Sequence, residues 1–154
     1  MVSDSRPQIE SFRLHAPLLR TGVRDHPMFD SDLLWCHLKI YAEGGENDLH
    51  AHPKEDHAFL VLEGSARFEN GAGEELPVGK FDGVFVPRGA LYRFTNSGEG
   101  NLVMLRIGAG SNSHAPGKGD ERTGPDGQPM AFNPSQIARP RYEERPDWFG
   151  GSRR

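Results

Sequence analysis

Three histidines fall within eight residues of this sequence, at His50, His52 and His57. Imidazole is the commonest protein ligand for a divalent metal ion. Two imidazoles at positions i and i+2 of an extended strand point to the same face, where both can reach one ion. The cluster is therefore a candidate metal site. The alternative is that these histidines lie on a polar surface loop and bind nothing.

The segments around the cluster carry patterns typical of β-strands. Residues 34–41 alternate in period two, and a short apolar run occupies residues 58–62. Asn70-Gly71-Ala72-Gly73 is a typical hairpin turn. Short strands joined by such turns, without a helical period, predict an all-β fold, either an antiparallel sandwich or a barrel. Further strands are predicted over residues 66–68, 84–86, 91–95 and 102–107.

At these spacings the sequence resembles the cupins, small jelly-roll barrels that hold a metal ion inside. Their first motif is Gly, five residues, His-X-His, three or four residues, Glu, six residues and Gly. Gly44, His50, His52 and Gly64 match this motif, and His57 stands where the family usually has Glu.

The second cupin motif is Gly, five residues, Pro-X-Gly, two residues, His, three residues and Asn. Pro87, Gly89 and Asn96 match it at the right spacing. Phe81 replaces the first Gly, and Tyr92 stands where the family's fourth metal ligand, a histidine, is expected. The sequence therefore departs from the family pattern close to the expected metal.

The resemblance, which covers residues 44–96, implies a single jelly-roll barrel over residues 31–109. Residues 1–30 are expected to be an N-terminal extension with only weak strand signals, such as residues 11–14. Residues 110–154 are expected to be an irregular arm rich in Gly and Pro, so that the whole chain is one domain.

Two features of the C-terminal arm predict local structure. Asn133 and Pro134 predict the start of a short helix that runs to Ala138. Trp148 and Phe149 predict a point where the arm docks. A homodimer is the expected assembly, because barrel sheets have exposed edges and cupins tend to dimerise.

The resemblance implies that His50, His52 and His57 hold one divalent metal ion. His57 is preferred to Asp56 because only His57 keeps the six-residue gap to Gly64. In the alternative, His57 is a surface residue, and Asp56 or nothing completes the site. Three neutral imidazoles would leave the ion its full charge and make it a stronger Lewis acid. Fe²⁺ is favoured, with Zn²⁺, Mn²⁺, Ni²⁺ or Cu²⁺ as alternatives.

Tyr92 has three interpretations. It is a tyrosinate ligand, a neutral phenol that donates a proton or hydrogen bond to bound substrate or dioxygen, or a side chain that only fills the barrel. Because side chains alternate along a strand, an inward-facing His57 predicts that Phe59 and Val61 also face the pocket, and Phe94 follows Tyr92 by two. The predicted pocket is largely apolar, as small-molecule sites usually are.

The composition is that of one globular domain without nucleic-acid or membrane partners. The chain has 154 residues, 35% of them hydrophobic, and a net charge of −4. No apolar run reaches the length of a membrane span, and the N-terminus lacks the apolar core of a signal peptide. Cys36, the only cysteine, is predicted to be buried and reduced, which fits the cytoplasm.

The fold alone does not determine the function, because the superfamily includes dioxygenases, isomerases, decarboxylases, lyases, sugar-binding regulators and storage proteins. The function has to be argued from the site. The leading hypothesis is a non-haem iron oxygenase, or a related lyase or isomerase, that acts on a small anionic or aromatic metabolite, with Tyr92 positioning or protonating the bound group. The alternative is a non-catalytic cupin that binds or senses a small ligand. Phe81 and Tyr92 favour it because they depart from the enzyme pattern. Arg93 and Arg106 are expected to be solvated charges unless their strands turn them inward.

Overall fold

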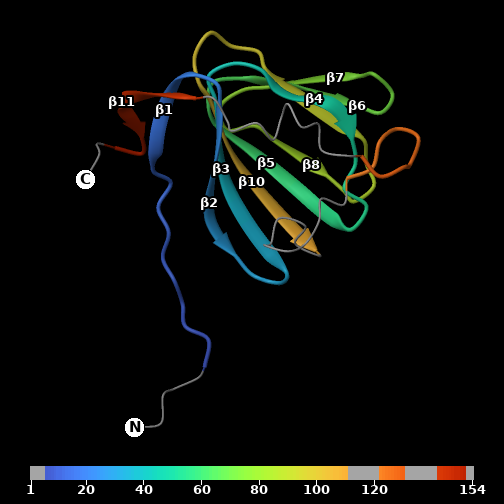
Figure 1. Ribbon diagram of the computed structural model, residues 1–154, viewed down its shortest axis with the longest axis horizontal. Helices are drawn as coiled ribbons and strands as arrows, with labels where there is room; N and C mark the ends of the chain where they lie inside the picture. Colours follow the sequence, from blue (N-terminus) through green and yellow to red (C-terminus); the bar gives the residue numbers. More distant parts are fainter. Residues whose placement is uncertain (1–5, 111–121, 131–141, 152–154) are drawn as a thin grey trace.

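The computed structural model describes residues 6–110, 122–130 and 142–151, and these residues form an all-β fold (Figure 1). Its two larger sheets have the strand orders β2-β3-β10-β5-β8 and β4-β9-β6-β7, and β1 pairs with β11 in a separate ribbon. The strands of the described residues are β1 (Ala16–Thr21), β2 (Val23–Asp30), β3 (Leu34–Tyr41), β4 (Gly45–His50), β5 (Glu55–Glu63), β6 (Ala66–Asn70), β7 (Glu75–Val78), β8 (Gly83–Val86), β9 (Tyr92–Asn96), β10 (Leu102–Gly110) and β11 (Glu143–Phe149).

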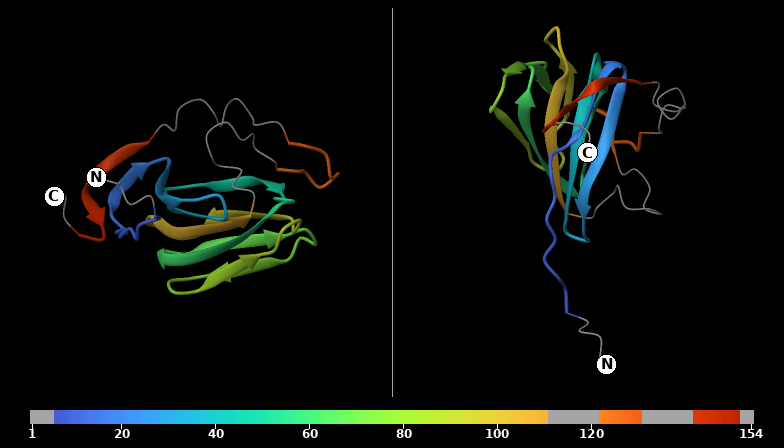
Figure 2. Two further views of the ribbon diagram at one scale, coloured as in Figure 1. Left: turned by 90° about the horizontal axis from the view of Figure 1, so that it is seen from below. Right: turned by 90° about the vertical axis from the view of Figure 1, so that its left-hand side faces the viewer.

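The two larger sheets face each other and enclose the interior, as Figure 2 shows. Period-two alternation along each strand sends one set of side chains inward. One end of the interior is filled by apolar and aromatic residues, and the other end holds the histidines. The expected jelly roll is thus confirmed. The apolar cluster consists of Tyr41, Phe59, Val61, Ala66, Phe68, Val86, Tyr92, Phe94, Leu102 and Met104.

A second apolar cluster lies between β1 and the five-stranded sheet, and its buried members are Ala16, Leu18, Leu19, Leu38, Ile40 and Val103. In β11, the ring of Trp148 lies 4.5 Å from the ring of His15, and Phe149 packs against this cluster. The C-terminal arm therefore contacts the barrel through β11. The predicted helix at residues 133–138 lies outside the described residues.

The N-terminal strands differ from the expectation. Residues 11–14 are not a strand, and β1 and β2 follow them instead. β2 is an edge strand of the five-stranded sheet, so this sheet begins at Val23, before residue 31. Its sequence is rich in charge and contains Pro27, which an edge strand tolerates because one side of its backbone is unpaired.

No helix among the described residues is long and apolar enough to cross a membrane. Cys36 is buried as a free thiol.

The motif glycines occupy backbone conformations that other residues avoid. Gly44, Gly64 and Gly89 have φ values of 71°, 78° and 82°. Phe81, which replaces the first glycine of the second motif, has φ 73° and is the one non-glycine residue with positive φ among the described residues. A side chain in this conformation is strained by about 1–2 kcal/mol. The family pattern therefore identifies a position where this chain carries backbone strain.

Candidate metal centre

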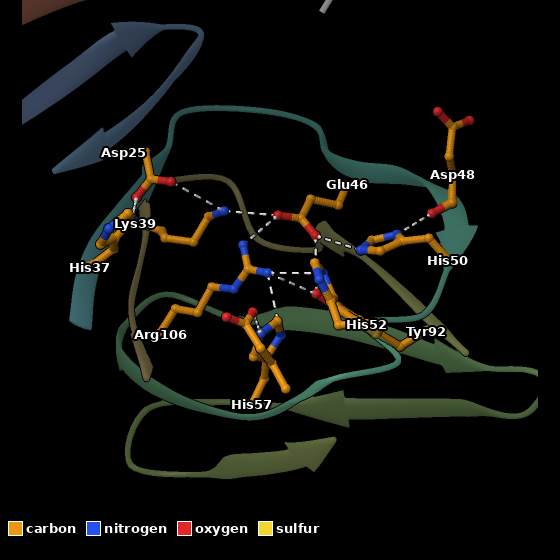
Figure 3. Close-up of polar contacts among 11 residues, drawn as sticks. Asp25, His37, Lys39, Glu46, Asp48, His50, His52, His57, Tyr92 and Arg106 are labelled. Carbon is orange, nitrogen blue, oxygen red and sulfur yellow. Dashed lines mark hydrogen bonds and ion pairs between the residues drawn. The ribbon is translucent and has the colours of Figure 1, made fainter. Parts of the chain in front are cut away.

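Strands of both sheets bring the polar residues of the interior together (Figure 3). His50 ends β4, His52 follows it, His57 lies in β5, Tyr92 begins β9 and Arg106 lies in β10. All five side chains are buried, with exposed fractions of 5% or less. The alternative in which the histidines lie on a surface loop is therefore wrong.

Glu55 joins His52 and His57 in a group that can hold a metal ion. One ligand atom from each of the three residues lies within 4.8 Å of the other two. Glu55 Oε2 lies 3.1 Å from His57 Nε2, and Glu55 Oε1 accepts a hydrogen bond of 3.2 Å from the indole Nε1 of Trp35. Asp56, the ligand that the shorter motif spacer would select, is partly exposed and accepts a hydrogen bond of 2.8 Å from the backbone N–H of Arg88.

The motif spacing does not predict Glu55, but strand alternation could have. Glu55 precedes His57 by two residues, so the two side chains share the inward face of β5. Its exposed fraction is 2%, and a carboxylate is rarely buried without a partner. The carboxylate of the site is therefore supplied two residues before His57, which stands at the position of the motif's Glu.

His50 lies outside the group of His52, Glu55 and His57. Its ring centroid is 5.2 Å from that of His52 and 4.6 Å from that of Tyr92. His50 Nδ1 lies 2.7 Å from the backbone oxygen of Asp48, to which it donates when the ring is neutral. The lone pair is then on Nε2, which is buried without a hydrogen-bond partner and lies 3.4 Å from Glu46 Oε2. The structure thus brings two of the three predicted histidines together and leaves the third beside them with an unused lone pair.

Arg106 lies in the middle of the site (Figure 3). Its Nη2 is 3.2 Å from His52 Nε2, 3.3 Å from His57 Nδ1 and 3.3 Å from Tyr92 Oη. Its Nη1 is 3.4 Å from Glu46 Oε1. The expectation that Arg106 is a solvated charge is wrong, because β10 is the central strand of its sheet and both of its faces are covered.

Arg93, the other candidate anion binder, lies on the outer face of β9. It forms an ion pair of 2.7 Å with Glu69 on the neighbouring strand β6. Nearby, a pocket of about 330 Å³ reaches Glu46 from the four-stranded sheet, and it is lined by Glu46, Arg67, Glu69, Glu75, Arg93, Phe94 and Thr95. Glu46 therefore lines this pocket and also contacts Arg106 and Tyr92 in the interior.

Burial keeps the three imidazoles neutral. Burial, assisted by the positive charge of Arg106, lowers the pKa of His52 to about 2. Burial lowers the pKa of His57 to about 4, although hydrogen bonding to Glu55 opposes this effect. Burial also lowers the pKa of His50. Neutral imidazoles have lone pairs to offer at pH 7, which is the state that a metal ion requires.

Glu46 and Tyr92 have opposite ionisation states. Burial alone would raise the pKa of Glu46, but the positive charges of Lys39 and Arg106 outweigh it and hold the pKa well below its ordinary range. Lys39 Nζ lies 2.8 Å from Glu46 Oε1. Burial raises the pKa of Tyr92, so its side chain is a neutral phenol that accepts from Arg106 and donates to Glu46 Oε2 at 3.4 Å. Without a metal beside it, Tyr92 is not a tyrosinate.

The predicted lining residues Phe59, Val61 and Phe94 are buried at the apolar end of the interior. The ring of Phe59 lies 5.6 Å from that of Tyr92, and the Arg106 guanidinium lies 5.5 Å from the Phe59 ring centroid. These contacts place apolar surface directly beside the polar centre.

The donor set fits a divalent metal ion. Two neutral imidazoles and one carboxylate converge, and the unpartnered Nε2 of His50 is a further donor nearby. The guanidinium of Arg106 contacts two of the same imidazoles. The site therefore holds suitable ligands and a positive charge that opposes a second cation.

Comparison with known proteins agrees with this architecture. The model of the cupin domain matches residues 37–108. An uncharacterized conserved protein with a double-stranded beta-helix domain from Klebsiella pneumoniae has a TM-score of 0.54 at 18% identity, over 60% of this chain and 81% of its own. The Cnp3 cupin domain of Schizosaccharomyces pombe has a TM-score of 0.54 at 19% identity, over 64% of this chain and 69% of its own.

KdgF from a Halomonas species is similar to the same extent, with a TM-score of 0.54 at 16% identity, over 61% of this chain and 84% of its own. These identities show a shared fold. No curated protein matches the sequence. Residues 37–108 therefore match the cupin domain, and the described strands share the double-stranded beta-helix fold of these proteins.

Proposed function

We propose that this protein is a metal-dependent cupin enzyme, and that it is a non-haem iron oxygenase acting on a small anionic metabolite. One observation carries the proposal: two imidazoles and one carboxylate, from His52, His57 and Glu55, converge in a buried site. This is the donor set typical of non-haem Fe²⁺ oxygenases, which keep open positions for substrate and dioxygen. The ion would supply the redox chemistry. A lyase or isomerase would use the same ligands to polarise a carbonyl.

The charges around the site favour an anionic substrate. Arg106 and Lys39 are buried cations on neighbouring strands, and Glu46 contacts both of them. A guanidinium pairs well with a carboxylate or phosphate group, particularly where water is excluded. Phe59 and Val61 supply the apolar wall that excludes water. We therefore propose a substrate with one acidic group and a small apolar or aromatic body.

Tyr92 is the residue that we propose to act on the bound substrate. Its phenol is neutral, and its hydroxyl lies between Arg106 and Glu46. A neutral hydroxyl in this place can donate a hydrogen bond or a proton to a substrate oxygen. A Tyr92→Phe variant tests this role, because it keeps the ring packing and removes only the hydroxyl.

The experiment for the proposed activity is oxygen consumption by iron-loaded protein with a panel of acidic catechols, diketones and thiols. We expect uptake with at least one substrate, and loss of that uptake in Glu55→Gln. Glu75→Gln is the matched control, because Glu75 is exposed on β7. A protein that binds iron and consumes no oxygen with any member of the panel contradicts the oxygenase proposal.

A second candidate function is the binding or sensing of a small anion without turnover. The observation that favours it is the contact of Arg106 with His52 and His57. A guanidinium held at these imidazoles can bind an anion without a metal ion. Calorimetry with small carboxylates and phosphates on metal-free protein separates the two functions. Tight binding that added iron does not change supports the sensor.

We also propose that the chain forms a homodimer. Leu60 and Phe85 lie on the outer face of the neighbouring strands β5 and β8, where their exposed fractions are 38% and 67%. β8 is an edge strand. A second copy placed across this edge would cover both the apolar side chains and the unpaired backbone.

A further inference from the structure

We infer that Arg106 is an internal cation that competes with the metal ion for the imidazoles of His52 and His57, so that metal binding displaces its guanidinium. The inference rests on the proposed metal-dependent function and concerns how the same site is regulated. It arises from the contacts of a single atom. Arg106 Nη2 carries two hydrogens and lies within 3.3 Å of three acceptors, His52 Nε2, His57 Nδ1 and Tyr92 Oη.

These contacts use the lone pairs that a metal would need. A guanidinium only donates hydrogen bonds, so these contacts are hydrogen bonds when His52 Nε2 and His57 Nδ1 present their lone pairs to it. His57 then carries its proton on Nε2 and donates it to Glu55 Oε2 at 3.1 Å. All three members of the metal group are thus engaged: His52 and His57 by Arg106, and Glu55 by His57.

Metal binding must break the contact between Arg106 and His57, whichever nitrogen the ion uses. If the ion binds Nδ1, it takes the lone pair that accepts from Arg106. If it binds Nε2, the ring proton moves to Nδ1, where it faces the N–H of the guanidinium. Two donors cannot share a hydrogen bond. The positive charge of Arg106 adds repulsion in either case, because burial reduces screening.

The guanidinium has other partners near it that can hold it after it leaves the imidazoles. Its Nη1 lies 3.4 Å from Glu46 Oε1, and its central carbon lies 5.2 Å from the ring centroid of Trp35 and 5.5 Å from that of Phe59. Arg106 Nε is buried without a hydrogen-bond partner. The contacts with the imidazoles, at 3.2 Å and 3.3 Å, are at the long end of the range for protein hydrogen bonds. Arg106 is therefore not fully satisfied where it lies, and it retains the carboxylate of Glu46 when it moves.

The test compares the affinity for Zn²⁺ of the wild-type protein and of Arg106→Met, measured by competition with a chelator. Methionine keeps much of the side-chain volume, and Glu46 keeps Lys39 as a partner at 2.8 Å. We expect Arg106→Met to bind Zn²⁺ at least tenfold more tightly. Arg93→Met is the matched control, because it removes an arginine from the outer face of the barrel, and its affinity should equal that of the wild type.

An Arg106→Met protein that folds, as circular dichroism reports, and binds Zn²⁺ no more tightly than the wild type overturns the inference alone. If neither protein binds any Zn²⁺, the proposed function fails as well. A second measurement needs no substitution at Arg106. In wild-type protein labelled with ¹⁵N-arginine, saturation with Zn²⁺ should shift the side-chain Nε signal of Arg106. An unchanged signal, with Zn²⁺ bound and the histidine signals shifted, also overturns the inference.

Discussion

Gly108 determines how Glu55, the proposed metal ligand, is held, and its replacement by alanine gives a quantitative prediction. Gly108 lies between Trp35 of β3 and His57 of β5. A Cβ at this position would lie 2.1 Å from Cε2 and 2.2 Å from Cζ2 of the Trp35 indole. Normal contact between carbons is about 3.5 Å, so the indole would have to move by roughly 1.4 Å. That movement breaks its hydrogen bond to Glu55.

We expect Gly108→Ala to lower the free energy of unfolding by about 2–3 kcal/mol, which is the usual effect of overpacking a buried site. For a chain of this size, the melting temperature should fall by roughly 5–10 °C. The affinity for Zn²⁺ should fall about 10-fold or more, because Glu55 loses the group that orients it. Gly100→Ala is the matched control, since nothing lies within 4 Å of a Cβ at Gly100.

Urea denaturation and Zn²⁺ titration of the two variants measure both effects. Gly108→Ala should lose stability and affinity, whereas Gly100→Ala should stay within about 0.5 kcal/mol of the wild type. A Gly108→Ala protein as stable as the Gly100→Ala control would show that the indole does not lie against Gly108. Lost stability together with normal Zn²⁺ affinity would refute the link between Trp35 and Glu55.

Three further predictions concern strain, protonation and assembly. Phe81→Gly should stabilise the fold by about 1 kcal/mol, because it relieves the positive φ, whereas Phe81→Ala, which keeps a Cβ, should gain little in the same thermal melts. In metal-free protein, stability should be greatest above pH 6.5 and decrease as the pH falls towards 4. The unfolded chain then takes up protons that His52 and His57 do not, since their pKa values are about 2 and about 4 in the fold. The loss is at most about 1.4 kcal/mol per histidine and pH unit, and equal stability in urea at pH 7 and pH 5 would contradict the neutral buried rings. Phe85→Lys should convert the dimer into a monomer in light scattering, and an unchanged mass would place the interface elsewhere.

Strands β3 and β5, next to the histidine cluster, could be predicted because each has a local pattern of apolar residues in the sequence. The pattern in residues 34–41 and the apolar run in residues 58–62 predict β3 and β5, and both strands are present. β2 and β11 could not be found in this way, because they are edge or ribbon strands in which no side chain is fully buried. Their pairing depends on neighbours that are distant in sequence. The local sequence pattern carries no information about those neighbours.

The site was only partly predictable for a similar reason. The spacing of His52 and His57 is a local property of the chain, and the structure places both rings inside. Glu55 was missed because the family motif directs attention to residues 56 and 57, although alternation from His57 indicates it. Arg106 was placed wrongly because arginine is usually exposed, and only the central position of β10 reverses that expectation.

The metal content of protein purified without a histidine tag tests the central claim most directly. Elemental analysis and Zn²⁺ or Fe²⁺ titration should give about one ion per chain for the wild type. Affinity should be at least tenfold weaker in Glu55→Gln and His52→Ala, and unchanged in Glu75→Gln. Wild-type protein that binds no divalent ion after incubation with iron, zinc, manganese, nickel and copper, or a Glu55→Gln variant that binds as tightly as the wild type, would contradict a metal centre built on His52, Glu55 and His57.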